Sequence, residues 1–130
     1  MRDRLDVDGF EWVFAVAGNG MLRGGAASED LAMFGCVVQI DGRGGDDWIN
    51  VSRESDLHCT TRRAVLRGGA GRDYLWGDSW PARMEGGRGD DVMNGGERND
   101  VLIGGPGRDQ ADGSTGRDVC RAERERYCER

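Results

Sequence analysis

The sequence contains no lysine, two prolines and a single histidine, His58. Without lysine, the chain can form neither a lysine Schiff base nor the lysine-containing phosphate loop of nucleotide-binding proteins. No stretch approaches 18 consecutive apolar residues, so the sequence predicts no membrane span. Acidic residues outnumber basic residues by 24 to 18, giving a net charge of -6, which repels phosphate backbones and disfavours nucleic-acid binding.

The four cysteines favour disulfides over a metal site. They are Cys36, Cys59, Cys120 and Cys128; none belongs to a C-x-x-C pair, and only His58 could join them on zinc. Four cysteines allow three pairings, and proximity in sequence favours Cys120 with Cys128, which leaves Cys36 with Cys59. The first residues lack the apolar run of a signal peptide, so the chain is either cytosolic or part of a longer protein. Because disulfides persist in oxidising compartments, we expect a secreted, extracellular protein.

Glycine is abundant, with 23 residues among 130, and it recurs in a nine-residue pattern. Nine successive windows of nine residues, starting at residue 41, carry an apolar residue at the eighth position: Trp48, Leu57, Leu66, Leu75, Met84, Met93, Leu102, Ala111 and Cys120. Aspartate occupies the sixth position in six of the nine, at Asp46, Asp73, Asp91, Asp100, Asp109 and Asp118. Such a fixed period is the sequence signature of a repeat architecture.

Each nine-residue unit predicts a glycine-rich turn followed by a short strand. Glycine permits the positive φ of a tight turn, and one inward apolar residue between two outward ones is the alternation of a strand. Two units make one complete coil, so the sequence predicts an all-β fold with two stacked parallel sheets. We expect capping strands and degenerate repeats in residues 1–40, the repeats in 41–121, and a C-terminal cap in 122–130, either a short helix or an irregular segment pinned by cysteine.

Several windows resemble a known family of repeats. GGAGRDYLW from Gly68, GGRGDDVMN from Gly86 and GGPGRDQAD from Gly104 are similar to the hemolysin-type calcium-binding repeats, also called repeats-in-toxin (RTX), with the consensus G-G-x-G-x-D-x-U-x. The resemblance covers residues 68–121 well, 41–67 partially and the first 40 weakly. It implies a right-handed parallel β-roll, calcium between the turns, and a secreted bacterial-type protein, whereas the four cysteines depart from the family.

Residues two units apart are expected to lie directly above one another, which predicts where the calcium ions bind. Turns that start at 50, 68, 86 and 104 stack on one side, and turns that start at 41, 59, 77, 95 and 113 stack on the other. We expect about three Ca²⁺ ions, bound between Asp73 and Asp91, between Asp91 and Asp109, and between Asp100 and Asp118. The predicted sites include the first glycine of each of these turns: Gly68, Gly86, Gly95, Gly104 and Gly113.

The same register predicts which acidic position is unused. Asp46 has Ala64 and then Ala82 as its stacked neighbours, so it lacks a partner carboxylate and is not expected to bind calcium. Trp48, at the inward position of that window, is expected to lie in the core.

We expect a non-enzymatic calcium-binding module whose folding depends on calcium. The sequence holds no H-E-x-x-H motif and no recognisable Ser/His/Asp arrangement, which disfavours a hydrolase. The alternative is an adhesion or carbohydrate-binding module, in which calcium shapes a surface around Trp76 and Trp80. The sequence does not identify an extracellular ligand or further domains.

Overall fold

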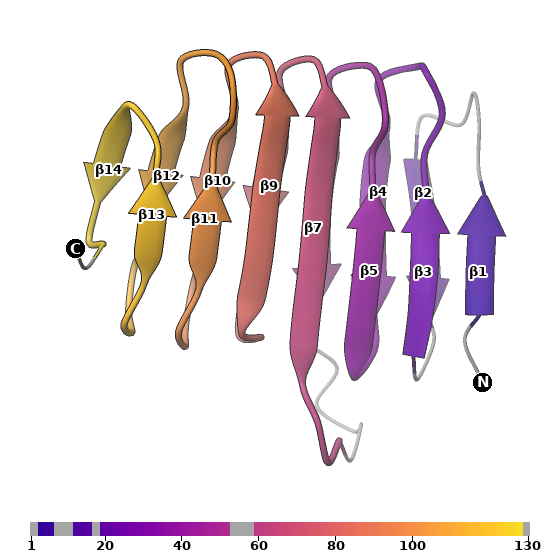
Figure 1. Cartoon of the computed structure of the whole chain (residues 1–130). Helices are drawn as coiled ribbons and strands as arrows, with labels where there is room; N and C mark the ends of the chain where they lie inside the picture. The colour runs from indigo at the N-terminus through magenta and orange to yellow at the C-terminus, as the bar shows by residue number, and fades with distance from the viewer. Residues whose placement is uncertain (1–2, 7–11, 17–18, 53–58, 129–130) are drawn as a thin grey trace.

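The computed structural model describes residues 3–6, 12–16, 19–52 and 59–128, and all the regular structure in these ranges is β-strand. The strands form two parallel sheets, between which the chain alternates (Figure 1). The first sheet contains β1 (Asp3–Asp6), β3 (Asn19–Arg23), β5 (Val37–Asp41), β7 (Arg63–Ala70), β9 (Ala82–Arg88), β11 (Val101–Ile103) and β13 (Val119–Arg121). The second contains β2 (Trp12–Val16), β4 (Asp30–Phe34), β6 (Trp48–Ser52), β8 (Tyr74–Trp76), β10 (Val92–Asn94), β12 (Gln110–Asp112) and β14 (Arg124–Arg126).

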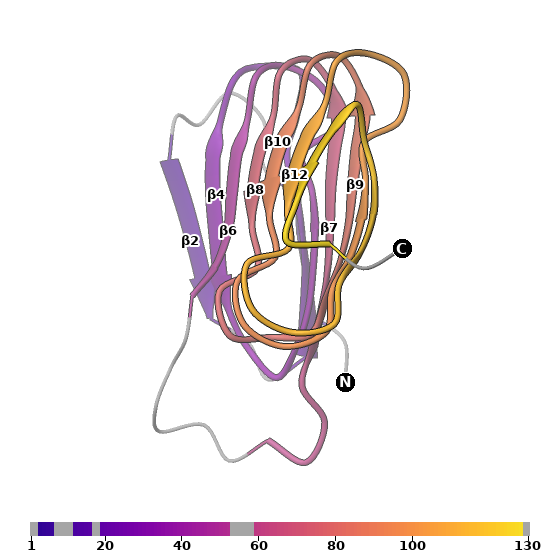
Figure 2. The same cartoon turned by 90° about the vertical axis from the view of Figure 1, so that its left-hand side faces the viewer.

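Each coil therefore contributes one strand to each sheet, and the view along the stack shows the coils superimposed (Figure 2). This arrangement confirms the all-β parallel β-roll with two nine-residue units per coil. The turns after β3, β5, β7, β9 and β11 lie at the top of Figure 1, and those that precede β9, β11 and β13 lie at the bottom.

A single narrow core separates the sheets. The three-residue strands from β8 to β13 present their middle residue inward, and a longer strand such as β5 buries alternate residues, because successive side chains of a strand point to opposite faces. The inward side chains are at most 8% exposed: Leu22, Leu31, Ile40, Ile49, Leu66, Leu75, Met84, Met93, Leu102, Ala111 and Cys120. The predicted inward residues from Leu66 to Cys120 are thus buried; Leu57 lies outside the described residues.

The predicted spacing of two units per coil holds within the repeats but fails at one place. Leu75 pairs with Met93, which lies two nine-residue units further along the chain. Ile49 pairs with Leu75, and the separation of these two residues in sequence is eight residues longer than two units. The eight additional residues fall between β6 and β7, where the described residues 60–62 are exposed, and the strands on either side of them remain stacked. The windows predicted from residues 50 and 59 are consequently not two regular repeats: Ala64 lies in β7, and Ser55 lies outside the described residues.

Trp48 corrects the predicted core. Its side chain is 56% exposed, and its neighbour Ile49 is buried instead. The nine-residue spacing from Ile40 runs to Ile49, so the predicted frame was displaced by one residue in this window.

Trp80, which the alternative function placed at a binding surface, is only 2% exposed. Its indole Nε1–H donates to the carbonyl of Gly35 at 2.8 Å, and the Arg62 guanidinium lies 5.2 Å from the ring centroid. Trp80 therefore fills the lower end of the roll near the insertion, and it is unavailable as a surface-binding residue.

Both ends of the described chain continue the coils. β1 pairs with β3 and β2 pairs with β4, so these N-terminal strands form the first coil. At the other end the residues after β13 form strand β14, where the sequence suggested a helix or an irregular cap. The structure pairs Cys36 with Cys59 and Cys120 with Cys128, which is the predicted pairing. Among the described residues, no helix is long and apolar enough to cross a membrane.

Candidate metal centre

The upper turns stack five deep and place one acidic side chain above another. We call residues 24–29, 42–47, 68–73, 86–91 and 104–109 the upper column. The backbone N–H of Asp73 donates to Asp91 Oδ1 at 2.9 Å, and the N–H of Asp91 donates to Asp109 Oδ1 at 2.9 Å. The same bond joins the N–H of Glu29 to Asp47 Oδ1, and the N–H of Asp47 to Asp73 Oδ1, each at 2.9 Å. One carboxylate oxygen of each aspartate thus links its turn to the preceding coil.

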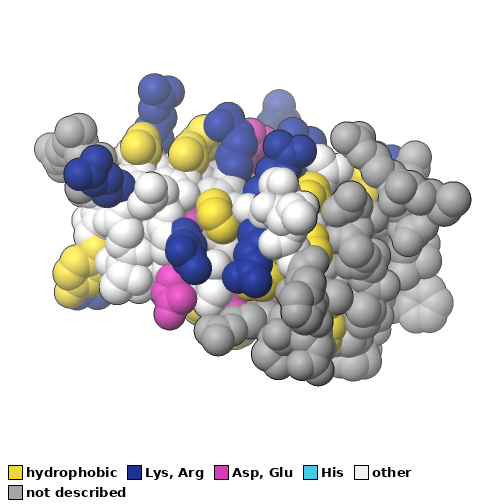
Figure 3. Space-filling model, turned by 90° about the horizontal axis from the view of Figure 1, so that it is seen from below, with side chains coloured by type: hydrophobic (Ala, Val, Ile, Leu, Met, Phe, Trp, Pro, Cys, Tyr) yellow, Lys and Arg dark blue, Asp and Glu magenta, His cyan; other side chains and the backbone are white. Residues whose placement is uncertain are grey.

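The lower turns repeat this arrangement over fewer coils. We call residues 77–82, 95–100 and 113–118 the lower column. The N–H of Asp100 donates to Asp118 Oδ1 at 2.7 Å, and the N–H of Ala82 donates to Asp100 Oδ1 at 2.8 Å. Because Ala82 has no carboxylate, the buried carboxylates of this column are those of Asp100 and Asp118, while Asp78 and Glu97 are exposed. From below, the described surface shows many arginine side chains and few acidic ones (Figure 3), since both column aspartates are buried.

The second carboxylate oxygen has a different environment. Five aspartates of the two columns are at most 1% exposed, and their Oδ2 atoms have no hydrogen-bond partner among the described residues: Asp47, Asp73, Asp91, Asp100 and Asp109. A buried charged oxygen without a partner is costly, so the arrangement requires either a proton or a cation.

The first glycine of each turn keeps space beside this oxygen. A Cβ added to Gly86 would overlap Asp91 Oδ2, and the equivalent overlaps occur at Gly68, Gly95 and Gly104. A Cβ on Gly68 would also lie 2.6 Å from the carbonyl oxygen of Gly86 in the next coil. Carboxylate and carbonyl oxygens from two coils therefore meet beside the first glycine. At Gly113 the added atom would lie 2.6 Å from Asp118 Oδ2.

Glycine is also required later in the turn. Gly87 and Gly89 have φ of 95° and 120°, a region that other residues rarely adopt. These two residues let the backbone turn sharply while its amides continue the ladder between coils: Gly87 N–H donates to the Gly104 carbonyl at 3.0 Å.

Burial and neighbouring charge disfavour the ionised carboxylates. Burial raises the pKa of Asp91 from 3.8 to about 7, and the charges of Asp73 and Asp109 add to the rise. The pKa of Asp47 and that of Asp100 also rise to about 7, mainly through burial, and the pKa of Asp73 rises to about 6. Burial likewise raises the pKa of Asp109. A bound cation would reverse this preference by compensating the charge.

The donor set fits calcium. Within the described residues, no group of three or more His, Cys, Asp or Glu side chains is arranged to hold a metal ion. Each junction between two turns that both carry an aspartate offers two carboxylates, so backbone carbonyl oxygens must complete the shell. Calcium accepts six to eight oxygen ligands of mixed type, whereas zinc prefers nitrogen and sulfur.

The structure brings together the predicted aspartates but corrects the position of Asp46. Asp73, Asp91 and Asp109 share the upper column, and Asp100 and Asp118 share the lower column. Asp46 was expected on the lower side, level with Ala64. It lies on the upper side and is exposed, and its Oδ1 accepts the N–H of Arg72 at 2.8 Å.

The column position that sequence analysis missed belongs to Asp47. It follows Asp46 directly, and its buried carboxylate continues the ladder above Asp73. The signal was present in the sequence, because Asp47 precedes the inward Ile49 by two residues, as Asp73 precedes Leu75. Glu29 precedes Leu31 in the same way.

Comparison with protein families agrees with this geometry. The model of the RTX calcium-binding nonapeptide repeat matches the chain in four copies, over residues 39–57, 63–79 and 85–120. These segments make up more than half of the chain, and the first interruption, at 58–62, falls in the insertion between β6 and β7. Searches of curated proteins and of solved structures gave no significant match.

Proposed function

The chain belongs to the RTX calcium-binding nonapeptide-repeat family, and from that premise we propose that it is a non-catalytic β-roll module of an exported protein, stabilised by Ca²⁺ between its stacked turns. The observation that carries this proposal is a set of buried Oδ2 atoms that have no hydrogen-bond partner among the described residues, those of Asp47, Asp73, Asp91, Asp100 and Asp109. Each lies beside a glycine whose missing side chain leaves room for it.

Pairs of aspartates in successive turns would hold the ions. The sequence assigned three such pairs, and the register of β6 and β8 supports a fourth, formed by Asp47 and Asp73. Bound calcium supplies positive charge to oxygens that otherwise repel one another. The residues supply the rest: Oδ1 fixes the spacing of the turns through a backbone N–H, and the glycines exclude side chains from the site.

Two features together support the proposed export. The disulfides Cys36–Cys59 and Cys120–Cys128 are consistent with an oxidising environment. A ligand that binds only the folded state stabilises that state, by about 2.7 kcal/mol for one site when the concentration of free ligand is 100 times the Kd. In low-calcium cytosol the chain would therefore remain loosely folded, and it would fold where calcium is abundant.

Calcium titration of three asparagine variants tests this assignment by calorimetry. Asparagine keeps an oxygen that can accept the backbone N–H but removes the charge. Asp91→Asn should lower the calcium affinity of two sites, because Asp91 lies between two turns that carry an aspartate. Asp118→Asn should lower the affinity of one site. Asp46→Asn should leave binding unchanged, because Asp46 is exposed outside the column. Equal losses in Asp46→Asn and Asp91→Asn would contradict the assignment.

A carbohydrate-binding role is the second candidate, and it is favoured by an aromatic cluster on the outer face of β6 and β8. The Trp48 ring stacks with Tyr74 and Trp76 at centroid distances of 4.8 and 5.8 Å. Next to Trp48 and Trp76 lies a groove whose lining includes Asp30, Asn50 and Asp78. Aromatic faces with a few polar groups suit an uncharged sugar, while the two carboxylates disfavour anionic glycans.

Glycan-array binding in calcium tests this second role. Binding of an uncharged glycan by the wild type that is lost in Trp48→Ala and Trp76→Ala would support it. The control Val92→Ala changes the next strand of the same face without removing an aromatic ring. If all three variants bind like the wild type, or if the wild type binds no glycan, the cluster has no role in sugar recognition.

A further inference from the structure

The C-terminal cap imitates a shortened coil. β14 pairs with β12 in parallel, and Glu125 pairs with Ala111. The separation of these two residues in sequence is four residues shorter than two nine-residue units. Met93 and Ala111, in contrast, are level with each other after two full units. Between β13 and β14, the two residues Ala122 and Glu123 stand where other coils have a six-residue glycine-rich turn. The cap lies outside the segments matched by the family model, which end at residue 120.

Glu123 takes the position of an aspartate in the upper column. Its Oε2 accepts the backbone N–H of Asp109 at 2.8 Å, and Asp109 Oδ1 in turn accepts the N–H of Asp91 at 2.9 Å. The Arg124 N–H also donates to the Asp109 carbonyl at 3.1 Å, as the Gln110 N–H does to the Asp91 carbonyl at 2.8 Å. Glutamate is one methylene longer than aspartate, and this extra length compensates for the missing residues of the turn.

The lower side of the cap shows the same imitation. A Cβ on Gly77 would lie 2.6 Å from the carbonyl oxygen of Gly95, the first glycine of the next lower turn. A Cβ on Gly113 would instead overlap the carbonyl oxygen of Tyr127. Tyr127 has a φ of 51°, an uncommon value for a tyrosine. The cap thus presents a carboxylate to the upper column and a carbonyl to the lower one.

Asp109 provides the independent sign of a ligand. It is 1% exposed, and its Oδ2 has no hydrogen-bond partner among the described residues, as for the aspartates between complete turns. Gly104 leaves the space beside this oxygen, because an added Cβ would overlap it. The junction between the 104–109 turn and the cap therefore shares two features with the internal junctions: a backbone N–H that donates to a carboxylate and, among the described residues, a buried carboxylate oxygen without a hydrogen-bond partner. It differs in its short second turn and in the exposed side chain of Glu123.

The other end of the upper column differs. Both carboxylate oxygens of Glu29 accept the N–H of Gly25, at 3.1 and 3.0 Å, so Glu29 closes its own turn. Glu123 instead directs its bonded oxygen to the preceding coil, and its side chain is exposed. Glu29 and Glu123 are thus the first and last acidic residues of the column that the structure describes, and they differ because Glu123 extends the pattern of carboxylates bonded to the preceding coil.

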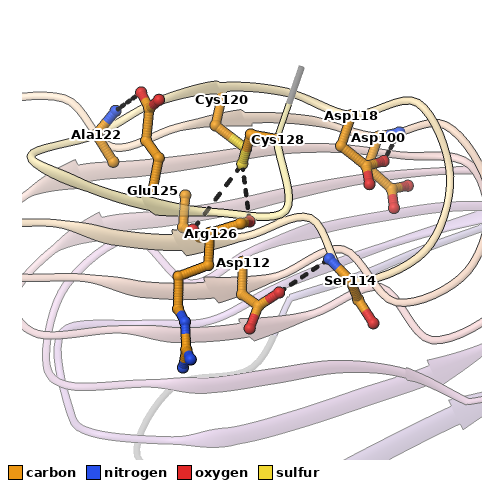
Figure 4. The surroundings of a disulfide bond; sticks show 10 residues. Asp100, Asp112, Ser114, Asp118, Cys120, Ala122, Glu125, Arg126 and Cys128 are labelled. Atoms are coloured by element: carbon orange, nitrogen blue, oxygen red, sulfur yellow. Dashed lines mark hydrogen bonds between the residues drawn. A yellow bond between two sulfur atoms is a disulfide. The ribbon is translucent and has the colours of Figure 1, made fainter. Parts of the chain in front are cut away.

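The disulfide fixes the cap in this position. Cys120 is the inward residue of β13, and its bond to Cys128 closes the segment that contains Glu123 (Figure 4). Within the loop, the Ala122 N–H donates to Glu125 Oε1 at 3.1 Å. These bonds hold the short connection between β13 and β14, so Glu123 can reach Asp109 without a glycine-rich turn.

We propose that Glu123 is a calcium ligand, and that the disulfide-closed cap and the 104–109 turn together bind one additional ion through Glu123 and Asp109. This inference rests on the proposed calcium-binding function. It assigns the cap a binding role in addition to covering the open end of the core.

Counting bound calcium by native mass spectrometry, together with calorimetric titration, tests the proposal on the full oxidised chain. Glu123→Gln keeps an acceptor for the Asp109 N–H but removes the charge, and it should bind one ion fewer than the wild type or bind its weakest ion at least tenfold less tightly. The matched control is Glu125→Gln, which removes the same charge two residues away but keeps an oxygen that can accept the Ala122 N–H, so it should bind like the wild type. Glu123→Asp keeps the charge but shortens the side chain, and it should resemble Glu123→Gln.

Hydrogen exchange locates the change. In calcium, Glu123→Gln should lose protection in residues 104–128 while residues 68–94 remain protected, which also shows that the variant is folded. If Glu123→Gln and Glu125→Gln bind the same number of ions with the same affinity, the proposal is wrong although the β-roll still binds calcium. If the wild type binds no calcium, the proposed function itself fails.

Discussion

Raising the pH of the calcium-free chain from about 5 to about 8 should unfold it. The pKa of a buried column aspartate such as Asp91 rises from 3.8 to about 7 in the folded state. An acid with a raised pKa binds its proton more tightly when folded, so its contribution to stability is complete below the unfolded value. That contribution is lost as the pH increases through the folded value. Stability should therefore fall between about pH 4 and pH 7.

The size of the effect follows from the number of such groups. One unit of pKa corresponds to about 1.4 kcal/mol, so ionising Asp91 alone in the folded state costs about 4 kcal/mol. The pKa values of Asp47 and Asp100 rise to about 7 as well, and that of Asp73 to about 6. A domain of this kind has a total stability of about 5–15 kcal/mol, so ionisation of two or three of these groups, at about 8–12 kcal/mol, is comparable to that stability.

Circular dichroism with urea titration, in chelator and in calcium, measures this dependence. In chelator, the free energy of unfolding should be greater at about pH 5 than at about pH 8; in saturating calcium the order should reverse, because protons compete with the ion. Asp91→Asn should flatten the dependence in chelator, and the exposed Asp46→Asn should not. A calcium-free chain that is equally stable at both pH values would refute the reasoning.

Three further predictions concern packing. Gly86→Ala should destabilise the protein by about 1–3 kcal/mol, because the added Cβ overlaps the Asp91 carboxylate. In the control Gly44→Ala, the added Cβ would meet nothing closer than 3.6 Å, so this variant should be nearly as stable as the wild type. Equal midpoints of urea unfolding for the two variants would contradict this prediction. Trp80→Phe leaves a buried carbonyl without its 2.8 Å hydrogen bond and should cost about 1–3 kcal/mol, so an unchanged melting temperature would be inconsistent with it. Replacing Cys36 and Cys59 by serine removes a link across 23 residues and should cost about 3 kcal/mol, measured by thermal unfolding in calcium; no loss would mean that the link does not constrain the unfolded chain.

The sequence predicted the β-roll because one residue in nine must point inward. That requirement leaves a periodic apolar position from Leu66 to Cys120, even where the glycines have changed. The predicted aspartates from Asp73 onward fall in two columns because no insertion interrupts the two-unit coils in this region. Periodicity alone is therefore sufficient wherever the repeat is continuous.

Register was not predictable across the insertion. The insertion of eight residues is close in length to one nine-residue unit, so the sequence between β6 and β7 could be interpreted as two degenerate repeats. As a result, the predicted positions before the insertion are displaced by one residue: Trp48 was assigned to the core in place of Ile49, and Asp46 to the turn position of Asp47. Pairing with the next coil resolves the choice, because Ile49 and Leu75 must both face the core.

Contacts between distant residues were also beyond the sequence pattern. Trp80 bonds to Gly35, 45 residues away, and no local period brings these two together. Glu123 joins Asp109 only because the cap coil is four residues shorter than the others. Both contacts lie where the repeat is interrupted, so the three-dimensional arrangement was needed to find them.

Anomalous diffraction from crystals of the full chain grown in calcium is the most direct test of calcium binding between the turns. We expect calcium peaks between successive turns of the upper column, on either side of Asp91, and a peak between Asp100 and Asp118 in the lower column. Calcium bound only at exposed carboxylates such as Asp46, with none in either column, would contradict it.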